Sequence, residues 1–127
     1  MINIKIGLIG YGYWGKNLAR NLVNLKVLTC IFDNNSSSIS NAKKLYPYLT
    51  FHEDIKTILN SDIDAVFISS PASTHGKIVR LALEAKKHVF VEKPLCLDYE
   101  EGIELKQLAH DNNLKLMVGH LLLYHPA

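Results

Sequence analysis

The chain has 127 residues, of which 48% are hydrophobic and 20% charged, and this composition is typical of one globular domain with a sizeable core. Its 14 Lys and Arg and 12 Asp and Glu give a formal net charge of +2, which is too balanced to favour nucleic acid or an anionic membrane as a partner. No signal peptide and no apolar run of membrane-spanning length are visible, so we expect a cytoplasmic protein. Cys30 and Cys96 lack the spacing of a metal site, and their apolar neighbours indicate buried thiols in a reducing compartment.

Apolar runs alternate with amphipathic stretches along the chain. In chain order these patterns predict strand 2–9, helix 13–24, strand 27–33, helix 36–46, strand 49–51, helix 53–60, strand 65–70, helix 74–86, strand 88–92, helix 98–112 and strand 115–120. The serines at 36–38 are candidate caps of the second helix, and Asp98 is a candidate cap of the last one.

This alternation, with short connections, indicates an α/β fold with helices on both faces of a parallel sheet. Right-handed crossovers make such a sheet doubly wound. Six strands in a chain of this length fit a Rossmann domain with a six-stranded, mostly parallel sheet. Helix 74–86 is expected to pack on that sheet through a stripe formed by Ile78, Leu81, Ala82 and Ala85.

The sequence Gly-Tyr-Gly-Tyr-Trp-Gly begins at Gly10 and matches the pattern G-x-G-x-x-G between a strand and a helix. Gly10 would make the tight turn, Gly12 would let the backbone approach a pyrophosphate, and Gly15 would let the helix pack close to the strand. Tyr13 and Trp14 complete the candidate cofactor-binding loop. The alternative is a glycine-rich turn that binds nothing.

Asp33 ends the second predicted strand and follows Gly12 at about the 20-residue spacing of a ribose-binding acid. Its carboxylate can accept hydrogen bonds from ribose hydroxyls and would repel a 2′-phosphate. Asn34 and the residues after it are neutral, so the sequence favours NAD over NADP, with Asn34 beside the ribose. A turn or helix-capping role is the alternative for Asp33.

Ligands of open α/β sheets bind beyond the carboxyl ends of the strands, which draws attention to Lys93. Desolvation and a neighbouring cationic nicotinamide would disfavour its ammonium form and suit it for proton transfer with a hydroxyl. Pro94 is expected to hold Lys93 extended and is a candidate for a cis peptide bond. The alternative is a surface lysine at a strand-to-loop corner.

Three motifs together resemble one family: Glu-Lys-Pro at 92–94, Ser-Pro-Ala-Ser-Thr-His at 70–75 and the glycine loop. They are similar to the glucose–fructose oxidoreductase/inositol dehydrogenase family (Gfo/Idh/MocA), over the whole chain. The resemblance implies that Lys93 is the catalytic lysine. It also implies that Ser70, Pro71 and His75 lie beside the nicotinamide half of the cofactor, and that Glu92 is a cofactor-side acid.

The family resemblance also implies a second α/β domain that supplies the substrate pocket and usually the oligomer interface. The 127 residues stop where that domain would begin, so we expect one NAD(P)-binding domain, 1–127, of a larger homo-oligomeric enzyme. His120 is a tentative substrate contact. Leu123 replaces an arginine of many members, as in a subgroup that acts on nucleotide sugars such as UDP-linked amino sugars.

Two functions from different classes are therefore compatible with the sequence. In the first, the chain is the cofactor domain of a dehydrogenase that oxidises a sugar or polyol hydroxyl, with Lys93 as acid/base. In the second, it is an isolated module that binds or senses NAD(H) without catalysis. A flavin- or CoA-binding Rossmann domain is a third class, for which the Glu-Lys-Pro motif is not expected.

Overall fold

The computed structural model describes residues 3–119, which fold into six strands, five α-helices and one short 3₁₀ turn, η1. In chain order these elements are β1 (Ile6–Ile9), α1 (Tyr13–Asn24), β2 (Leu28–Phe32), α2 (Ser36–Leu45), β3 (Thr50–Phe51), α3 (Ile55–Leu59), β4 (Ala65–Ile68), η1 (Ala72–Thr74), α4 (His75–Glu84), β5 (His88–Glu92), α5 (Tyr99–Asp111) and β6 (Leu116–Gly119). All eleven expected helices and strands are therefore present, with shifted ends. No helix within residues 3–119 is long and apolar enough to cross a bilayer.

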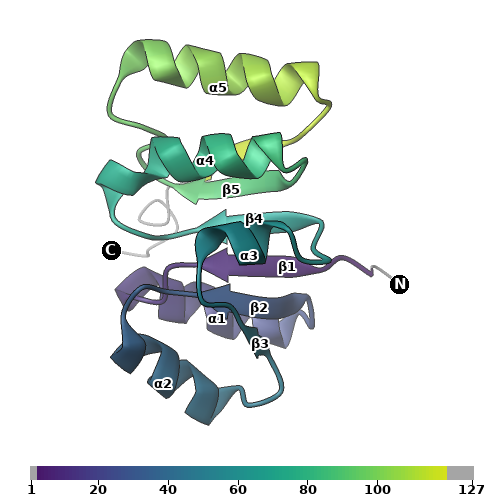
Figure 1. Ribbon diagram of the computed structural model, residues 1–127, viewed down its shortest axis with the longest axis vertical. Helices are drawn as coiled ribbons and strands as arrows, with labels where there is room; N and C mark the ends of the chain where they lie inside the picture. The colour runs from purple at the N-terminus through teal and green to yellow at the C-terminus, as the bar shows by residue number, and fades with distance from the viewer. Residues whose placement is uncertain (1–2, 120–127) are drawn as a thin grey trace, which may run out of the picture.

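The strands form one sheet in the order β3-β2-β1-β4-β5-β6, and Figure 1 labels all of them except β6. Every neighbouring pair is parallel, so the sheet is fully parallel rather than mostly parallel. The doubly wound Rossmann prediction is confirmed. Successive strands are added on one side of β1 up to β3 and on its other side from β4 onward, so the strand order reverses between β1 and β4. This switch point is where open α/β sheets form their ligand crevice.

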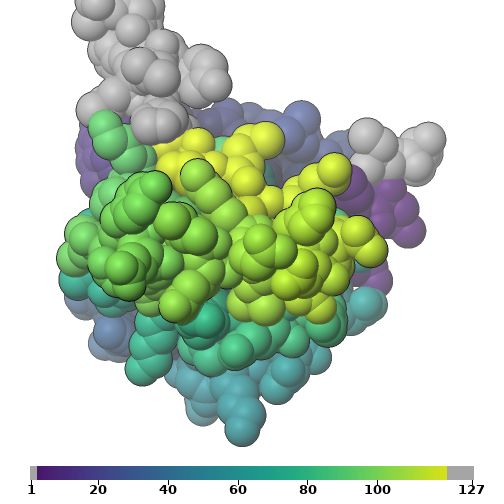
Figure 2. Space-filling view, turned by 90° about the horizontal axis from the view of Figure 1, so that it is seen from above, coloured from purple at the N-terminus to yellow at the C-terminus, as the bar shows by residue number. Residues whose placement is uncertain are grey.

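Helices cover both faces of the sheet and bury two separate apolar clusters. Figure 1 shows α3 and α4 in front of the sheet and α1 behind it. Ile9 belongs to the cluster under α3, α4 and α5, whereas Leu8 belongs to the cluster under α1 and α2. α5 forms the outer surface of the molecule at the β6 edge of the sheet, and its yellow-green atoms face the viewer in Figure 2. Neighbouring residues of the central strand thus anchor opposite faces, as the twofold period of a strand requires.

Two element boundaries differ from the prediction for local reasons. β4 ends at Ile68, two residues earlier than predicted, and the next residue, Ser69, donates its hydroxyl to the Gly10 carbonyl oxygen at 2.8 Å. The predicted helix 74–86 is a 3₁₀ turn followed by α4. Its expected stripe is wrong at Leu81, which is 38% exposed, while Val79 and Leu83 are buried instead.

The caps also differ from the prediction. The side chain that caps α2 is Asn35, which accepts the Ser38 N–H at 3.0 Å, rather than one of the serines. Asp98 occupies the N-cap position of α5, but its side chain makes no capping hydrogen bond.

The two cysteines differ in burial. Cys30 is buried, and burial raises the pKa of its thiol. Cys96 is only half-buried, because it lies in the loop between β5 and α5.

Candidate functional site

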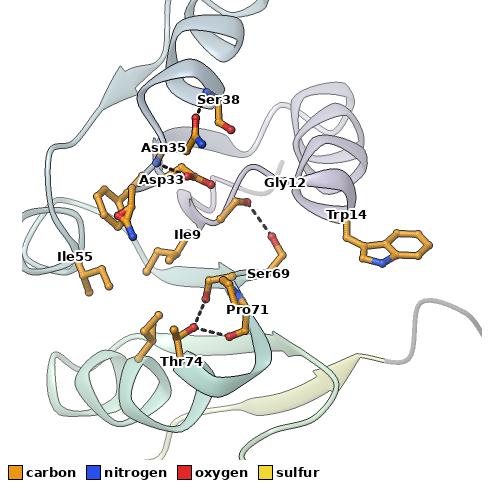
Figure 3. A pocket seen from close by; sticks show the side chains of 15 residues that line it. Ile9, Gly12, Trp14, Asp33, Asn35, Ser38, Ile55, Ser69, Pro71 and Thr74 are labelled. Atoms are coloured by element: carbon orange, nitrogen blue, oxygen red, sulfur yellow. Dashed lines mark hydrogen bonds between the residues drawn. The ribbon is translucent and has the colours of Figure 1, made fainter.

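A pocket of about 810 Å³ opens at the carboxyl ends of β1, β2 and β4. Its walls come from the glycine turn after β1, the loop after β2 and the loop after β4, as Figure 3 shows. This position is the switch point of the sheet, and the volume lies within the range of small-molecule and cofactor sites. Asp33 is the one charged residue among those that line it in the described part of the chain.

Gly10 makes the turn that joins β1 to α1. Its φ of +101° lies in the region that glycine adopts without strain. A Cβ at Gly10 would lie 2.6 Å from the Ser70 backbone nitrogen, so the loop after β4 packs directly against this turn. The Gly10 N–H donates to the Phe32 carbonyl oxygen at 2.9 Å, which ties the turn to β2 as well.

Gly12 and Gly15 have opposite surroundings. Gly12 is exposed at the N-cap of α1, and a Cβ there would meet no atom within 4 Å, so this position opens into the pocket. A Cβ at Gly15 would collide with the Gly10 carbonyl oxygen, so Gly15 allows the close approach of helix and turn. No side chain caps α1, which leaves its first N–H groups available to an anion.

Two backbone N–H groups hold the Asp33 carboxylate in place. Oδ2 accepts the Tyr11 N–H at 2.6 Å, and Oδ1 accepts the Asn35 N–H at 2.7 Å. The first bond comes from the glycine turn and the second from the loop after β2. A carboxylate offers about four lone-pair directions, so each oxygen retains one for a ligand. Asp33 is thus a structural link between two pocket walls and also an acceptor that lines the pocket.

The loop after β4 is closed by hydroxyl groups. The Thr74 hydroxyl donates to the Pro71 carbonyl oxygen at 2.6 Å, and Ser70 Oγ lies 2.8 Å from Thr74 Oγ1. His75 is buried at the start of α4. Its Nδ1 lies 2.6 Å from the Pro94 carbonyl oxygen and its Nε2 lies 2.7 Å from the Ser70 carbonyl oxygen.

Lys93 immediately follows β5, as expected, and its N–H donates to the Gly119 carbonyl oxygen at 3.0 Å. The Lys93–Pro94 peptide bond is cis, as the sequence suggested. The Lys93 side chain is exposed, so the desolvation expected for it is not found within residues 3–119. Glu92 is half-buried, and its Oε2 is buried without a hydrogen-bond partner in the described part of the chain.

The structure brings seven of the predicted site residues to the pocket wall: Gly10, Gly12, Trp14, Asp33, Asn34, Ser70 and Pro71. Figure 3 shows Trp14 at the opposite end from Asp33. Five others do not line it: Gly15 and His75 lie beneath the surface, Tyr13 is 76% exposed, and Glu92 and Lys93 lie at the end of β5. His120 lies outside the described residues.

Several lining residues were not foreseen. Ile9 and Phe32 are the last residues of β1 and β2, so the strand-end rule, if applied to apolar residues, would have found them. Ser69 directly precedes the predicted Ser70, whereas Ser38 lies on α2, four residues after Asn34. Ile55 is the first residue of α3, which lies in the connection between β3 and β4, and no local sequence pattern marks it as a pocket residue.

Comparison with known proteins places this site in context. UDP-N-acetylglucosamine 3-dehydrogenase of Acidithiobacillus ferrooxidans is 32% identical over 127 residues, which are 100% of this chain and 40% of that protein. Scyllo-inositol dehydrogenase of Lactobacillus casei, solved with NAD(H) and scyllo-inositol, is 33% identical with a TM-score of 0.87 over 98% of this chain and 38% of that one.

A second solved relative carries the other dinucleotide. Biliverdin reductase of Synechocystis sp. PCC 6803, solved with biliverdin and NADP⁺, is 28% identical with a TM-score of 0.89, over 94% of this chain and 39% of that one. The chain thus spans about two fifths of the length of these relatives. The model of the oxidoreductase family with an NAD-binding Rossmann fold, GFO_IDH_MocA, matches residues 4–120, and this chain therefore belongs to that family.

Proposed function

We propose that this chain binds NAD(H) and serves as the dinucleotide-binding domain, residues 1–127, of a dehydrogenase that acts on a sugar or polyol hydroxyl. One observation carries the proposal: a single pocket joins the uncapped start of α1, at Gly12, to the Asp33 carboxylate. These are the groups that a pyrophosphate and a ribose diol require. The remaining three fifths of the solved relatives have no counterpart in these residues.

The pocket residues can hold the cofactor with its adenosine half at Asp33 and its nicotinamide half at the loop after β4. Gly12 leaves space for a pyrophosphate beside the first N–H groups of α1, because no side chain occupies that space. Asp33 and Asn34 would then hold the adenosine ribose. Ser70 and Pro71, on the loop after β4, would lie toward the nicotinamide, which is the group that exchanges hydride when bound.

The charge of the pocket favours NAD over NADP. A 2′-phosphate would have to lie near Asp33, and no Lys or Arg lines the described pocket to compensate the repulsion. The NADP⁺ of the biliverdin reductase relative is a property of that protein. We therefore base the proposed preference of this chain for NAD on its own pocket residues.

Proton transfer is assigned to Lys93. It follows β5 at the same edge of the sheet as the pocket, and its amine is exposed and able to meet a substrate. It would take the proton of the hydroxyl that is oxidised. The UDP-amino-sugar dehydrogenase of Acidithiobacillus ferrooxidans makes a UDP-linked sugar the first substrate class to test, with inositols second.

A separate observation supports a second candidate function. Lys93 does not line the pocket and nothing in residues 3–119 covers it, so the described domain has no enclosed reaction site. This arrangement favours binding or sensing of NAD(H) without turnover. Robust reduction of NAD by the purified chain with UDP-sugars or inositols would exclude that function.

The test uses Trp14, the single tryptophan, which lines the pocket. NADH should quench its emission saturably, and NADPH should bind at least about tenfold more weakly, the equivalent of one lost charge-assisted hydrogen bond. Asp33→Asn should reduce the ratio of the NADPH dissociation constant to the NADH dissociation constant. Lys93→Ala should leave NADH affinity within about threefold, because Lys93 does not line the pocket. Absence of quenching in a chain shown by circular dichroism to be folded would contradict the proposal.

A further inference from the structure

His75 is the one polar or charged side chain that is buried within the core of residues 3–119, with 2% of its surface exposed. Both of its ring nitrogens lie at hydrogen-bond distance from backbone carbonyl oxygens, at 2.6 Å from Pro94 and 2.7 Å from Ser70. A carbonyl oxygen can only accept a hydrogen bond. Each of these two short contacts therefore needs a proton on the ring nitrogen.

A neutral imidazole has one N–H, so it can make only one of the two bonds. The other nitrogen would direct its lone pair at a carbonyl oxygen, in a buried place where no water can intervene. The ring that satisfies both contacts carries two protons. His88 provides a contrast in the same chain, because its Nδ1 accepts the Lys115 N–H at 3.0 Å and so carries no proton.

The two carbonyl groups belong to the two loops that frame the site. Ser70 lines the pocket on the loop after β4, and Pro94 directly follows Lys93 on the loop after β5. We propose that His75 is a positioning residue that ties these loops together by donating from both ring nitrogens. It would set the place of Lys93 relative to the pocket, and in this respect the inference rests on the proposed function of Lys93.

Charged groups lie on several of the elements packed around His75. The Glu101 carboxylate of α5 lies against Gly76, the next residue of α4. β4 and η1 carry no charged group. The remaining titratable groups on the elements packed against α4 are Lys56 of α3, His88 and Glu92 of β5, and Tyr99, Glu100, Glu104, Lys106, His110 and Asp111 of α5, where Glu104 pairs with Arg80.

The first measurement is a nitrogen-15 NMR spectrum of the histidine rings of the unmodified chain, at neutral pH. We expect His75 to show a proton on both ring nitrogens and His88 to show an unprotonated Nδ1. A His75 ring with one unprotonated nitrogen would overturn the proposal. This readout needs neither cofactor nor substrate, and it does not depend on any variant folding.

The second measurement compares amide hydrogen exchange in His75→Gln and His88→Gln. Glutamine at 75 can reach only one of the two carbonyl groups, so the Lys93 N–H should exchange about tenfold faster. In His88→Gln the Lys115 N–H should exchange faster and the Lys93 N–H should not change. Unchanged exchange at Lys93 in His75→Gln would overturn the loop connection. A chain that gives the expected spectra and binds no NADH would instead contradict the proposed function alone.

Discussion

At the scale of single residues, two glycines of the same turn separate folding from binding. Gly10 has a positive φ, and any side chain there would strike the backbone of Ser69 and Ser70. Gly12 has an ordinary φ of −80°, and a side chain there would extend into open space. Gly10 is therefore required by the fold, whereas the fold places no such demand on Gly12, and the proposed pyrophosphate site would account for a glycine there.

Gly10→Ala should lower the free energy of unfolding by at least about 2 kcal/mol, since it adds a strained φ to an atomic overlap. Gly12→Ala should change it by no more than about 1 kcal/mol, the usual range at an N-cap. The same Gly12→Ala should weaken NADH binding at least about tenfold, because its methyl group would occupy the space assigned to the pyrophosphate.

Urea unfolding followed by circular dichroism measures the stability of both variants, and the Trp14 titration measures NADH affinity. Each variant serves as the control of the other. Gly12→Ala with unchanged NADH affinity would show that the pyrophosphate does not lie at the start of α1. Gly10→Ala with unchanged stability would show that the turn can relax away from the loop after β4.

At the scale of elements, the ends were harder to predict than the elements themselves. Their existence follows from periodicity, and all of them form. At their ends, contacts between distant segments replace the periodic pattern, as just after β4, where the Ser69 hydroxyl donates to the Gly10 carbonyl oxygen. The capping residues show the same limit. Asp98 has the right residue type and position for a cap, but only the folded geometry shows that its side chain makes no such bond.

Two aspartates at N-cap positions form a matched pair. The Asp54 side chain accepts the Thr57 N–H at 2.7 Å at the start of α3, whereas Asp98 makes no such bond at the start of α5. Asp54→Ala should therefore lower the midpoint of urea unfolding measurably at pH 7, and Asp98→Ala should change it less. Equal effects of the two substitutions would show that the capping hydrogen bond from Thr57 to Asp54 does not decide the difference, and that the residue type at the N-cap is sufficient.

The effect of Asp54 should depend on pH in a definite direction. Hydrogen bonds from Thr57 hold the pKa of the Asp54 carboxyl below its ordinary value of 3.8. A lowered pKa contributes stability that is complete above the ordinary value and is lost as the pH falls through the pKa of the folded state. The difference between Asp54→Ala and the unmodified chain should thus be constant from pH 7 to about pH 5 and shrink below pH 3.8. A difference that grew with acidity would contradict this assignment.

At the scale of the whole molecule, one half of the site could be predicted and the other could not. Gly12 and Asp33 lie where the motif spacing placed them, because a strand, a turn and a helix fix the geometry locally. The position of His75 depends on two loops that meet only in the folded sheet. Its sequence position is compatible with a cofactor contact, and only the structure shows it buried behind the pocket wall.

The two apolar clusters should unfold together, because the central strand β1 contributes to both of them. Leu8 and Ile68 are fully buried on opposite faces of adjacent strands, one in each cluster. Leu8→Ala and Ile68→Ala should each cost about 2–5 kcal/mol, and the double variant should be additive within about 0.5 kcal/mol, since the two side chains belong to separate clusters on opposite faces of the sheet. In every variant, Trp14 emission and far-ultraviolet circular dichroism should report one coincident transition. If Ile68→Ala lost helical signal before Trp14 responded, the face under α3, α4 and α5 would unfold as a separate unit.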